Sequence, residues 1–214
     1  GSDADVMFVA QPVDGADESE ALKWATGICD SVRTRLGRPS QDPPLDVDID
    51  LRPEGRNGPV VRTLDSYRRY YQQWGETWEM QALLRATWIA GDKDLGIEFL
   101  RMIDDFRYPP GGVDDKVVQE VRRMKARVDS ERLPRGADRK THTKLGRGAL
   151  TDVEWTVQLL TMQHGDDAQN LRNTSTLETL RELASGEYIA ESDAEILRDA
   201  WITATIARLS LIHI

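Results

Sequence analysis

The chain has 214 residues, with 28 Lys and Arg against 37 Asp and Glu, so its net charge is −9. A hydrophobic content of 39% is sufficient for a real core, whereas one cysteine, Cys29, excludes an internal disulfide framework and, with only three histidines, argues against structural zinc. No apolar run approaches the roughly 18 to 20 residues of a membrane span, so we expect a soluble, cytoplasmic protein without membrane partners.

Charge is distributed unevenly along the chain. Residues 122–147 carry ten basic and three acidic side chains, a local charge of +7 that leaves −16 for the rest. This pattern disfavours a general nucleic-acid surface, and we expect no nucleic-acid partner. The basic segment is interpreted either as an anion-binding loop or as a solvated helix face that runs into a flexible loop.

The predicted elements change in kind along the chain. Residues 1–10 read as a loop that feeds a strand, residues 18–36 as an amphipathic helix, and residues 45–51 as a strand of period two. From there helices dominate, and the predicted helical ranges are 63–74, 77–89, 92–106, 114–130 and 150–163. A basic loop is predicted over 134–148. Two final helices are predicted to start at Thr174 and Ser192. Most of the six tryptophans are expected in cores. The order indicates an α+β protein, with a head over 1–112, truncated at its start, and an all-α part over 113–214, truncated at its end.

Two predicted strands carry aspartates with a spacing of two. Asp3 and Asp5 share one face if their segment is extended, and Asp46, Asp48 and Asp50 share one face of the second strand. Neighbouring strands of this kind would gather carboxylates that tolerate one another only beside a cation, for which Mg²⁺ or Mn²⁺ is the natural choice. Carboxylate-bound divalent metals support nucleotidyl transfer. The alternative is that both are ordinary polar strand faces.

Four ordered segments resemble a known family. Residues 1–5 (GSDAD) resemble the signature of polymerase-beta-like nucleotidyltransferases, and three further segments resemble motifs of bacterial glutamine synthetase adenylyltransferase: 47–55 (VDIDLRPEG), 78–86 (WEMQALLRA) and 144–155 (KLGRGALTDVEW). Details of the first and third segments resemble the C-terminal, adenylylating module of that family more than its N-terminal, AMP-removing module.

The resemblance implies a fold and a reaction. It implies a polymerase-beta-like head followed by a helical bundle, with Asp3, Asp5 and Asp48 as catalytic, metal-binding carboxylates and Gly1 and Ser2 on the triphosphate of ATP. The implied reaction is transfer of AMP to a tyrosine of glutamine synthetase, with Mg²⁺ or Mn²⁺ as cofactor. It also implies that the full-length enzyme removes AMP and responds to the PII signal protein.

Several further side chains are candidates for the nucleotide. Arg52 ends the acidic strand and could reach a phosphate or pair with Asp50 or Asp46, while Asp50 itself is expected to face solvent. Ala149 stands where the family usually has glycine, which raises the question of a positive φ there. The remaining candidates lie on a predicted helix or in the basic loop before one: Glu79, Gln81, Arg85 and Lys144.

Two other functions stay open at this point. The first is a uridylyltransferase of the PII protein, which shares the Lys-x-Gly-Arg-Gly segment and would use UTP in place of ATP. The second is a catalytically inactive fragment that binds glutamine synthetase through its helical part.

Overall fold

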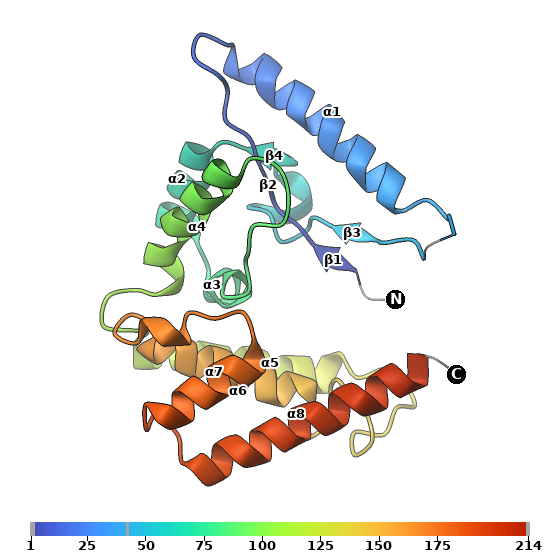
Figure 1. Cartoon of the computed structure of the whole chain (residues 1–214), viewed down its shortest axis with the longest axis vertical. Helices are drawn as coiled ribbons and strands as arrows, with labels where there is room; N and C mark the ends of the chain where they lie inside the picture. Colours follow the sequence, from blue (N-terminus) through green and yellow to red (C-terminus); the bar gives the residue numbers. More distant parts are fainter. Residues whose placement is uncertain (1–2, 42, 213–214) are drawn as a thin grey trace. The chain divides into compact units, whose positions relative to one another are not determined.

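A computed structural model describes residues 3–41 and 43–212 (Figure 1). The chain forms two compact units, one made of Gly1–Ala82 and Thr87–Phe106, the other of Leu83–Ala86 and Arg107–Ile214. The segment Leu83–Ala86 therefore leaves the first unit for four residues before the chain returns to it. Strands occur in the first unit and helices in both, which confirms the α+β class.

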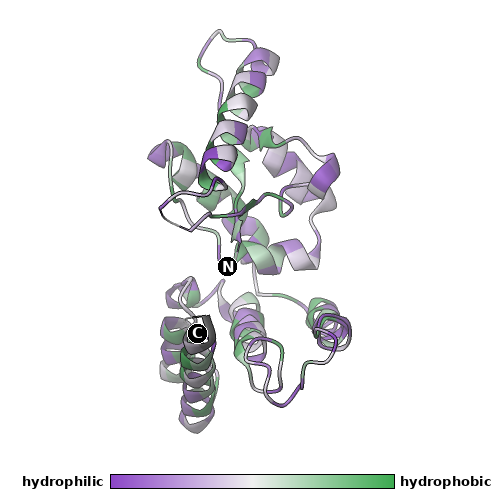
Figure 2. Ribbon diagram, turned by 90° about the vertical axis from the view of Figure 1, so that its right-hand side faces the viewer, coloured by the Kyte–Doolittle hydropathy of each residue, from purple (hydrophilic) through white to green (hydrophobic). Residues whose placement is uncertain are grey.

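The first unit contains two small parallel sheets and four helices. β1 (Ala4–Asp5) pairs with β3 (Val47–Asp48), and β2 (Phe8–Val9) pairs with β4 (Val61–Arg62). The predicted strand over 45–51 is thus shortened to its central two residues, and β4 was not predicted. The other elements are α1 (Glu18–Leu36), a 3-10 helix (Gly55–Asn57), α2 (Leu64–Trp74), α3 (Thr77–Leu83) and α4 (Lys93–Arg107). Figure 2 shows that hydrophobic residues, drawn in green, gather at the centre of this unit, where the strands lie.

Aromatic side chains join α2 to α4. Tyr67 and Tyr71 are buried on one face of α2, one turn apart. The Tyr67 ring meets Phe99 edge-on with centroids 5.0 Å apart, and the Tyr71 ring stacks on Phe106 at 5.1 Å. The Tyr67 hydroxyl donates to the carbonyl of Phe8 at 3.2 Å, which ties α2 to β2 and satisfies the buried phenol.

Helix α1 has the predicted bounds but not the predicted burial. Asp17 caps it by accepting from the Glu20 N–H, and Gly37 ends it. None of its residues is buried, however, and Trp24 is 71% exposed. The expectation of tryptophans in cores is also wrong for Trp74, which is 70% exposed, and Trp78 and Trp88 stay nearly 40% exposed.

The second unit is helical in its described residues. Its helices are α5 (Asp115–Glu131), α6 (Leu150–His164), a 3-10 turn (Gln169–Leu171), α7 (Thr176–Ser185) and α8 (Glu191–Ile212). The core lies between α6, α7 and α8 and buries Val153, Val157, Leu171, Leu180 and Leu183. No helix or strand forms over 134–148, as the lack of apolar periodicity in this basic segment predicted.

Three predicted helix ends needed correction. α3 ends at Leu83 and not at residue 89, and α8 begins one residue before Ser192. Ser175, not Thr174, caps α7, because its hydroxyl accepts from the Glu178 N–H. Among the described residues, no helix is long and apolar enough to cross a membrane.

Candidate active site

The register of the first sheet brings two of the predicted carboxylates together. Asp5 of β1 is the partner of Asp48 of β3, as Ala4 is of Val47. Register partners on parallel strands project to the same face, about 4.8 Å apart, so the two carboxylates leave the sheet side by side. Val47 and Ile49, which alternate with Asp48, are buried. The period-two pattern therefore separates an apolar face from an acidic one, as predicted.

The third predicted carboxylate, Asp3, lies just before β1 and is exposed. Among residues 3–41 and 43–212, no three His, Cys, Asp or Glu side chains are gathered closely enough to hold a metal ion as they stand. The structure thus brings Asp5 and Asp48 together and does not gather all three carboxylates. The predicted triphosphate contacts Gly1 and Ser2 lie outside the described residues.

Hydrogen bonds fix Asp48 at both its backbone and its side chain. Its carbonyl accepts from the N–H of Val6 at 2.8 Å, in the ladder between β3 and β1. Its Oδ1 accepts from the N–H of Asp50 at 2.7 Å. Because the sheet fixes the Cα and the N–H fixes one oxygen, the direction of this carboxylate is set before any ligand arrives.

The sequence predicted that Asp50 faces solvent, but in the structure its carboxylate lies beside two arginines. Its Oδ2 accepts from Nε of Arg56 at 2.8 Å, and its Oδ1 lies 3.6 Å from Nη1 of Arg52. The pair with Arg56 is exposed on the arginine side and contributes little on its own. Asp50 therefore belongs to the turn after β3.

Arg52 is the most buried of these cations, with 6% of its surface exposed. Its Nη1 donates to the carbonyl of Ile49 at 2.7 Å, and its Nε donates to the carbonyl of Gly58 at 3.1 Å. Of the two interpretations from the sequence, the structure places Arg52 in the one that pairs it with Asp50. Its predicted contact with a phosphate stays a prediction.

The predicted helical candidates Glu79 and Gln81 are buried in the first unit. Glu79 Oε2 accepts from the N–H of Glu76, so this side chain reaches back to cap the start of α3. Removal from water is the main cause that raises the pKa of Glu79. Glu79 thus has a structural task that its sequence position, three residues after a cap, could have revealed.

The other two candidates, Arg85 and Lys144, belong to the second unit. Arg85 Nη1 donates to Glu154 Oε1 of α6 at 2.7 Å. Lys144 is exposed in the basic loop. The predicted site residues are therefore divided between the two units.

An ion pair fixes the end of the basic loop against α5. Asp152 accepts from Lys125 Nζ at 2.5 Å and from the N–H of Gly148 at 2.7 Å, so its carboxylate stabilises the start of α6. Gly148 has φ +71°, whereas Ala149 has φ −82°. Alanine at 149 therefore meets no conformational obstacle, because the left-handed residue is the glycine before it.

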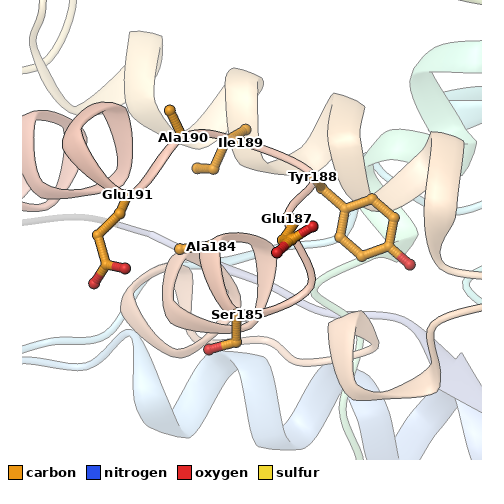
Figure 3. A pocket seen from close by; sticks show the side chains of 7 residues that line it. All are labelled: Ala184, Ser185, Glu187, Tyr188, Ile189, Ala190 and Glu191. Carbon is orange, nitrogen blue, oxygen red and sulfur yellow. The ribbon is translucent and has the colours of Figure 1, made fainter.

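One hollow in the second unit carries no predicted site residue. It is lined by Ala184, Ser185, Glu187, Tyr188, Ile189, Ala190 and Glu191. Figure 3 shows these side chains around the end of α7, the following loop and the first residue of α8. Two glutamates and no basic side chain make this hollow unsuitable for a nucleotide.

Comparisons with known proteins agree with the motifs. The family model described as glutamate-ammonia ligase adenylyltransferase matches residues 1–102, and the one described as GlnD PII-uridylyltransferase matches residues 122–211. By these names, both halves of the chain are similar to nucleotidyltransferases.

Curated relatives match almost the entire chain under one name. "Bifunctional glutamine synthetase adenylyltransferase/adenylyl-removing enzyme" is 64% identical over 212 residues in Corynebacterium efficiens and in Corynebacterium diphtheriae, and 59% identical in Mycobacterium tuberculosis. Each match covers 99% of this chain but only 20 to 21% of the relative. The chain therefore belongs to the glutamine synthetase adenylyltransferase family, and it spans about a fifth of the length of these relatives.

Proposed function

We propose that the chain is part of the C-terminal, adenylylating module of such an enzyme, with the first unit as a polymerase-beta-like nucleotidyltransferase head. In this proposal the module transfers AMP from ATP to a tyrosine of glutamine synthetase. The observation that carries it is the register of Asp5 with Asp48, because two adjacent strands then present carboxylates on one face. The identity of 64% across the chain to proteins named for this activity supports the same assignment.

The donor set fits a hard divalent cation. Asp5 and Asp48 offer carboxylate oxygens from neighbouring strands, and oxygen is the ligand that Mg²⁺ and Mn²⁺ prefer. Asp3, two residues before Asp5, is the proposed third ligand. When bound, the metal would neutralise charge on the triphosphate and on the departing pyrophosphate.

The protein's own residues hold the reacting groups in position for the transfer. The tyrosine hydroxyl attacks the α-phosphorus of ATP in line and forms a new oxygen–phosphorus bond. The bond between the α-phosphorus and the oxygen that bridges it to the β-phosphate breaks. Pyrophosphate leaves, and the phenolic proton passes to solvent. Asp48, held by the N–H of Asp50, keeps its direction during this step, so little reorganisation is needed. In the full-length enzyme, we propose PII protein as regulator and the cytoplasm as location.

The test is labelling of glutamine synthetase with ATP carrying a radioactive α-phosphate, in Mg²⁺. We expect label with the wild-type chain and loss of about two orders of magnitude or more in Asp5→Asn and Asp48→Asn. Asp14→Asn, in the exposed turn before α1, is the matched control and should label normally. Normal labelling by Asp48→Asn would refute the carboxylate assignment.

Two other arms separate the alternatives. The match of residues 122–211 to the uridylyltransferase model favours a second candidate, PII uridylylation, for which UTP and PII protein replace ATP and glutamine synthetase. Calorimetry with ATP and Mg²⁺ addresses the third. Tight binding to glutamine synthetase without any heat from ATP would identify an inactive binding module.

A further inference from the structure

We propose that Arg52 is a positioning residue for Asp48 and acts through the single peptide group that joins Ile49 to Asp50. The inference rests on the proposed function, because it takes Asp48 as a ligand of the divalent cation. It deepens that function by naming what orients the ligand. It also gives Arg52 a task other than the phosphate contact predicted from its sequence position.

The two hydrogen bonds that matter are on opposite sides of one peptide group. The carbonyl of Ile49 accepts from Arg52 Nη1 at 2.7 Å, and the N–H of Asp50 donates to Asp48 Oδ1 at 2.7 Å. A peptide group is planar, so fixing the direction of its carbonyl also fixes the direction of its N–H. The backbone N–H of Arg52 also donates to this carbonyl, at 3.2 Å, and the shorter bond from the guanidinium adds a charged donor to it. The Arg52 side chain therefore helps to determine where the N–H that holds Asp48 points.

The positive charge of Arg52 also acts through this peptide group, by polarising it. A hydrogen bond from a guanidinium is stronger than one from a neutral donor, and it polarises the amide that accepts it. A polarised amide is in turn a better donor at its N–H. The buried positive charge of Arg52 thus strengthens the bond to Asp48 without touching it.

The surroundings of Arg52 make it an anchor. Its side chain is 7% exposed, Nε donates to the carbonyl of Gly58 at 3.1 Å, and Nη1 lies 3.6 Å from Asp50 Oδ1. If the guanidinium swung out toward a phosphate, the carbonyl of Gly58 would lose its donor, and the carbonyl of Ile49 would keep only the backbone N–H of Arg52, at 3.2 Å. Weakening or losing hydrogen bonds at buried carbonyls is costly. The burial therefore favours positioning over direct contact.

The consequence is a preset ligand. The backbone of Asp48 is held by Val6 in the β1–β3 ladder, and its Oδ1 is held by the peptide group that Arg52 anchors. With one oxygen fixed, the direction of the second is fixed as well. Removing Arg52 should loosen this direction and weaken the cation without removing any ligand.

The chain offers a matched control in Arg56. This side chain also binds Asp50, at 2.8 Å through Nε, but it is 86% exposed and donates to the carboxylate, not to the peptide group. Arg56→Gln thus removes a neighbouring positive charge while the path from Arg52 to Asp48 stays intact. A purely electrostatic effect of nearby arginines would affect both variants.

The experiment measures Mn²⁺ affinity by electron paramagnetic resonance on the full 214-residue chain without nucleotide. Outer-shell partners of metal ligands are typically worth a factor of ten or more, so we expect Arg52→Gln to weaken Mn²⁺ about tenfold and Arg56→Gln by less than about twofold. Arg52→Lys, which keeps the charge and one donor, should lose about threefold. A residue that only stabilised the turn would lower the urea midpoint and leave the affinity unchanged.

The outcomes separate the two proposals. If wild type binds Mn²⁺, Asp48→Asn does not, and Arg52→Gln binds like Arg56→Gln, the positioning role is overturned while the carboxylate site stands. If Asp48→Asn binds as tightly as wild type, the proposed metal site fails, and the positioning role with it. Should Arg52→Gln not fold by circular dichroism, Arg52→Lys decides, and unchanged affinity in that variant overturns the inference.

Discussion

The turn after β3 leaves no room for a side chain at Gly58, which makes one methyl group a sharp test. A Cβ at Gly58 would lie 2.0 Å from the carbonyl oxygen of Pro53, far inside any normal contact. The obstacle is backbone, so it cannot rotate away. In Gly58→Ala the turn itself must therefore move, and the carbonyl of Gly58 moves with it, away from Arg52 Nε.

The expected cost follows from these two contacts. Overpacking a fixed backbone costs about 1 to 3 kcal/mol, and a lost hydrogen bond from a charged donor costs about 1.5 to 3 kcal/mol. We therefore expect Gly58→Ala to lower the free energy of unfolding by about 2.5 to 6 kcal/mol. Because the same movement shifts Arg52, Mn²⁺ affinity should fall with it.

Gly27 provides the matched control, with the opposite expected sign. It lies inside α1, and a Cβ there would meet nothing within 4 Å. Alanine is the better helix former, so Gly27→Ala should raise the free energy of unfolding by about 0.5 to 1 kcal/mol and leave Mn²⁺ affinity unchanged. Both residues lie in the first unit, so one urea series followed by circular dichroism compares them directly. Equal urea midpoints for wild type and Gly58→Ala would refute the reasoning.

Three further experiments test other contacts. Tyr67→Phe removes the hydroxyl that donates to the carbonyl of Phe8, and urea unfolding should show a loss of about 1 kcal/mol; a neutral result would mean that the bond contributes nothing. Burial raises the pKa of Glu79, so wild type gains stability below its unfolded pKa and loses it as pH rises through the folded pKa. As pH rises above about 4, the ordinary pKa of glutamate, the urea midpoint of Glu79→Gln should therefore rise relative to that of wild type, and a constant difference would contradict this. A double-mutant cycle with Arg85→Ala and Glu154→Ala should give a coupling of about 0.5 kcal/mol, because the pair is partly exposed; a value several times larger would contradict it.

Local signals in the sequence predicted helix ends better than they predicted burial. The bounds of α1 agree with the structure because Asp17 and Gly37 mark them through short-range hydrogen bonds. The apolar spacing within α1 also predicted a buried face, yet Trp24 is exposed. Burial depends on what the rest of the fold places beside a helix, and the periodicity of one segment carries no information about that.

The early end of α3 shows the same limit. The predicted helix runs on to Ile89, but the carbonyls of Leu83 and Ala86 accept from the buried guanidinium of Arg107 at 3.0 and 3.5 Å. This partner lies more than twenty residues away in the chain. A long-range bond of this kind leaves no trace in the local pattern of residues 83–89.

In the candidate site, the spacing of residues predicted which face of the strand each side chain is on, but not the hydrogen bonds that hold the site in place. The alternation of Val47, Asp48 and Ile49 correctly predicted which side chains leave the sheet on the acidic face. Pairing with β1 could be expected only from the matching aspartates there. The task of Arg52 could not be predicted, since it depends on how the turn folds back to bring Gly58 within reach.

The path of the chain between its two units determines how the molecule can be dissected. Arg107 is 8% exposed, and its guanidinium donates to the carbonyls of Leu83 and Ala86, which precede α4 in sequence. A helical fragment that begins at residue 107 would therefore carry a buried cation without these acceptors. A fragment that ends at residue 106 would keep four residues that belong to the other unit. A single cut in the chain therefore yields neither unit with all of its own contacts. An isolated helical unit would need the segment Leu83–Ala86 supplied as a linked or added peptide.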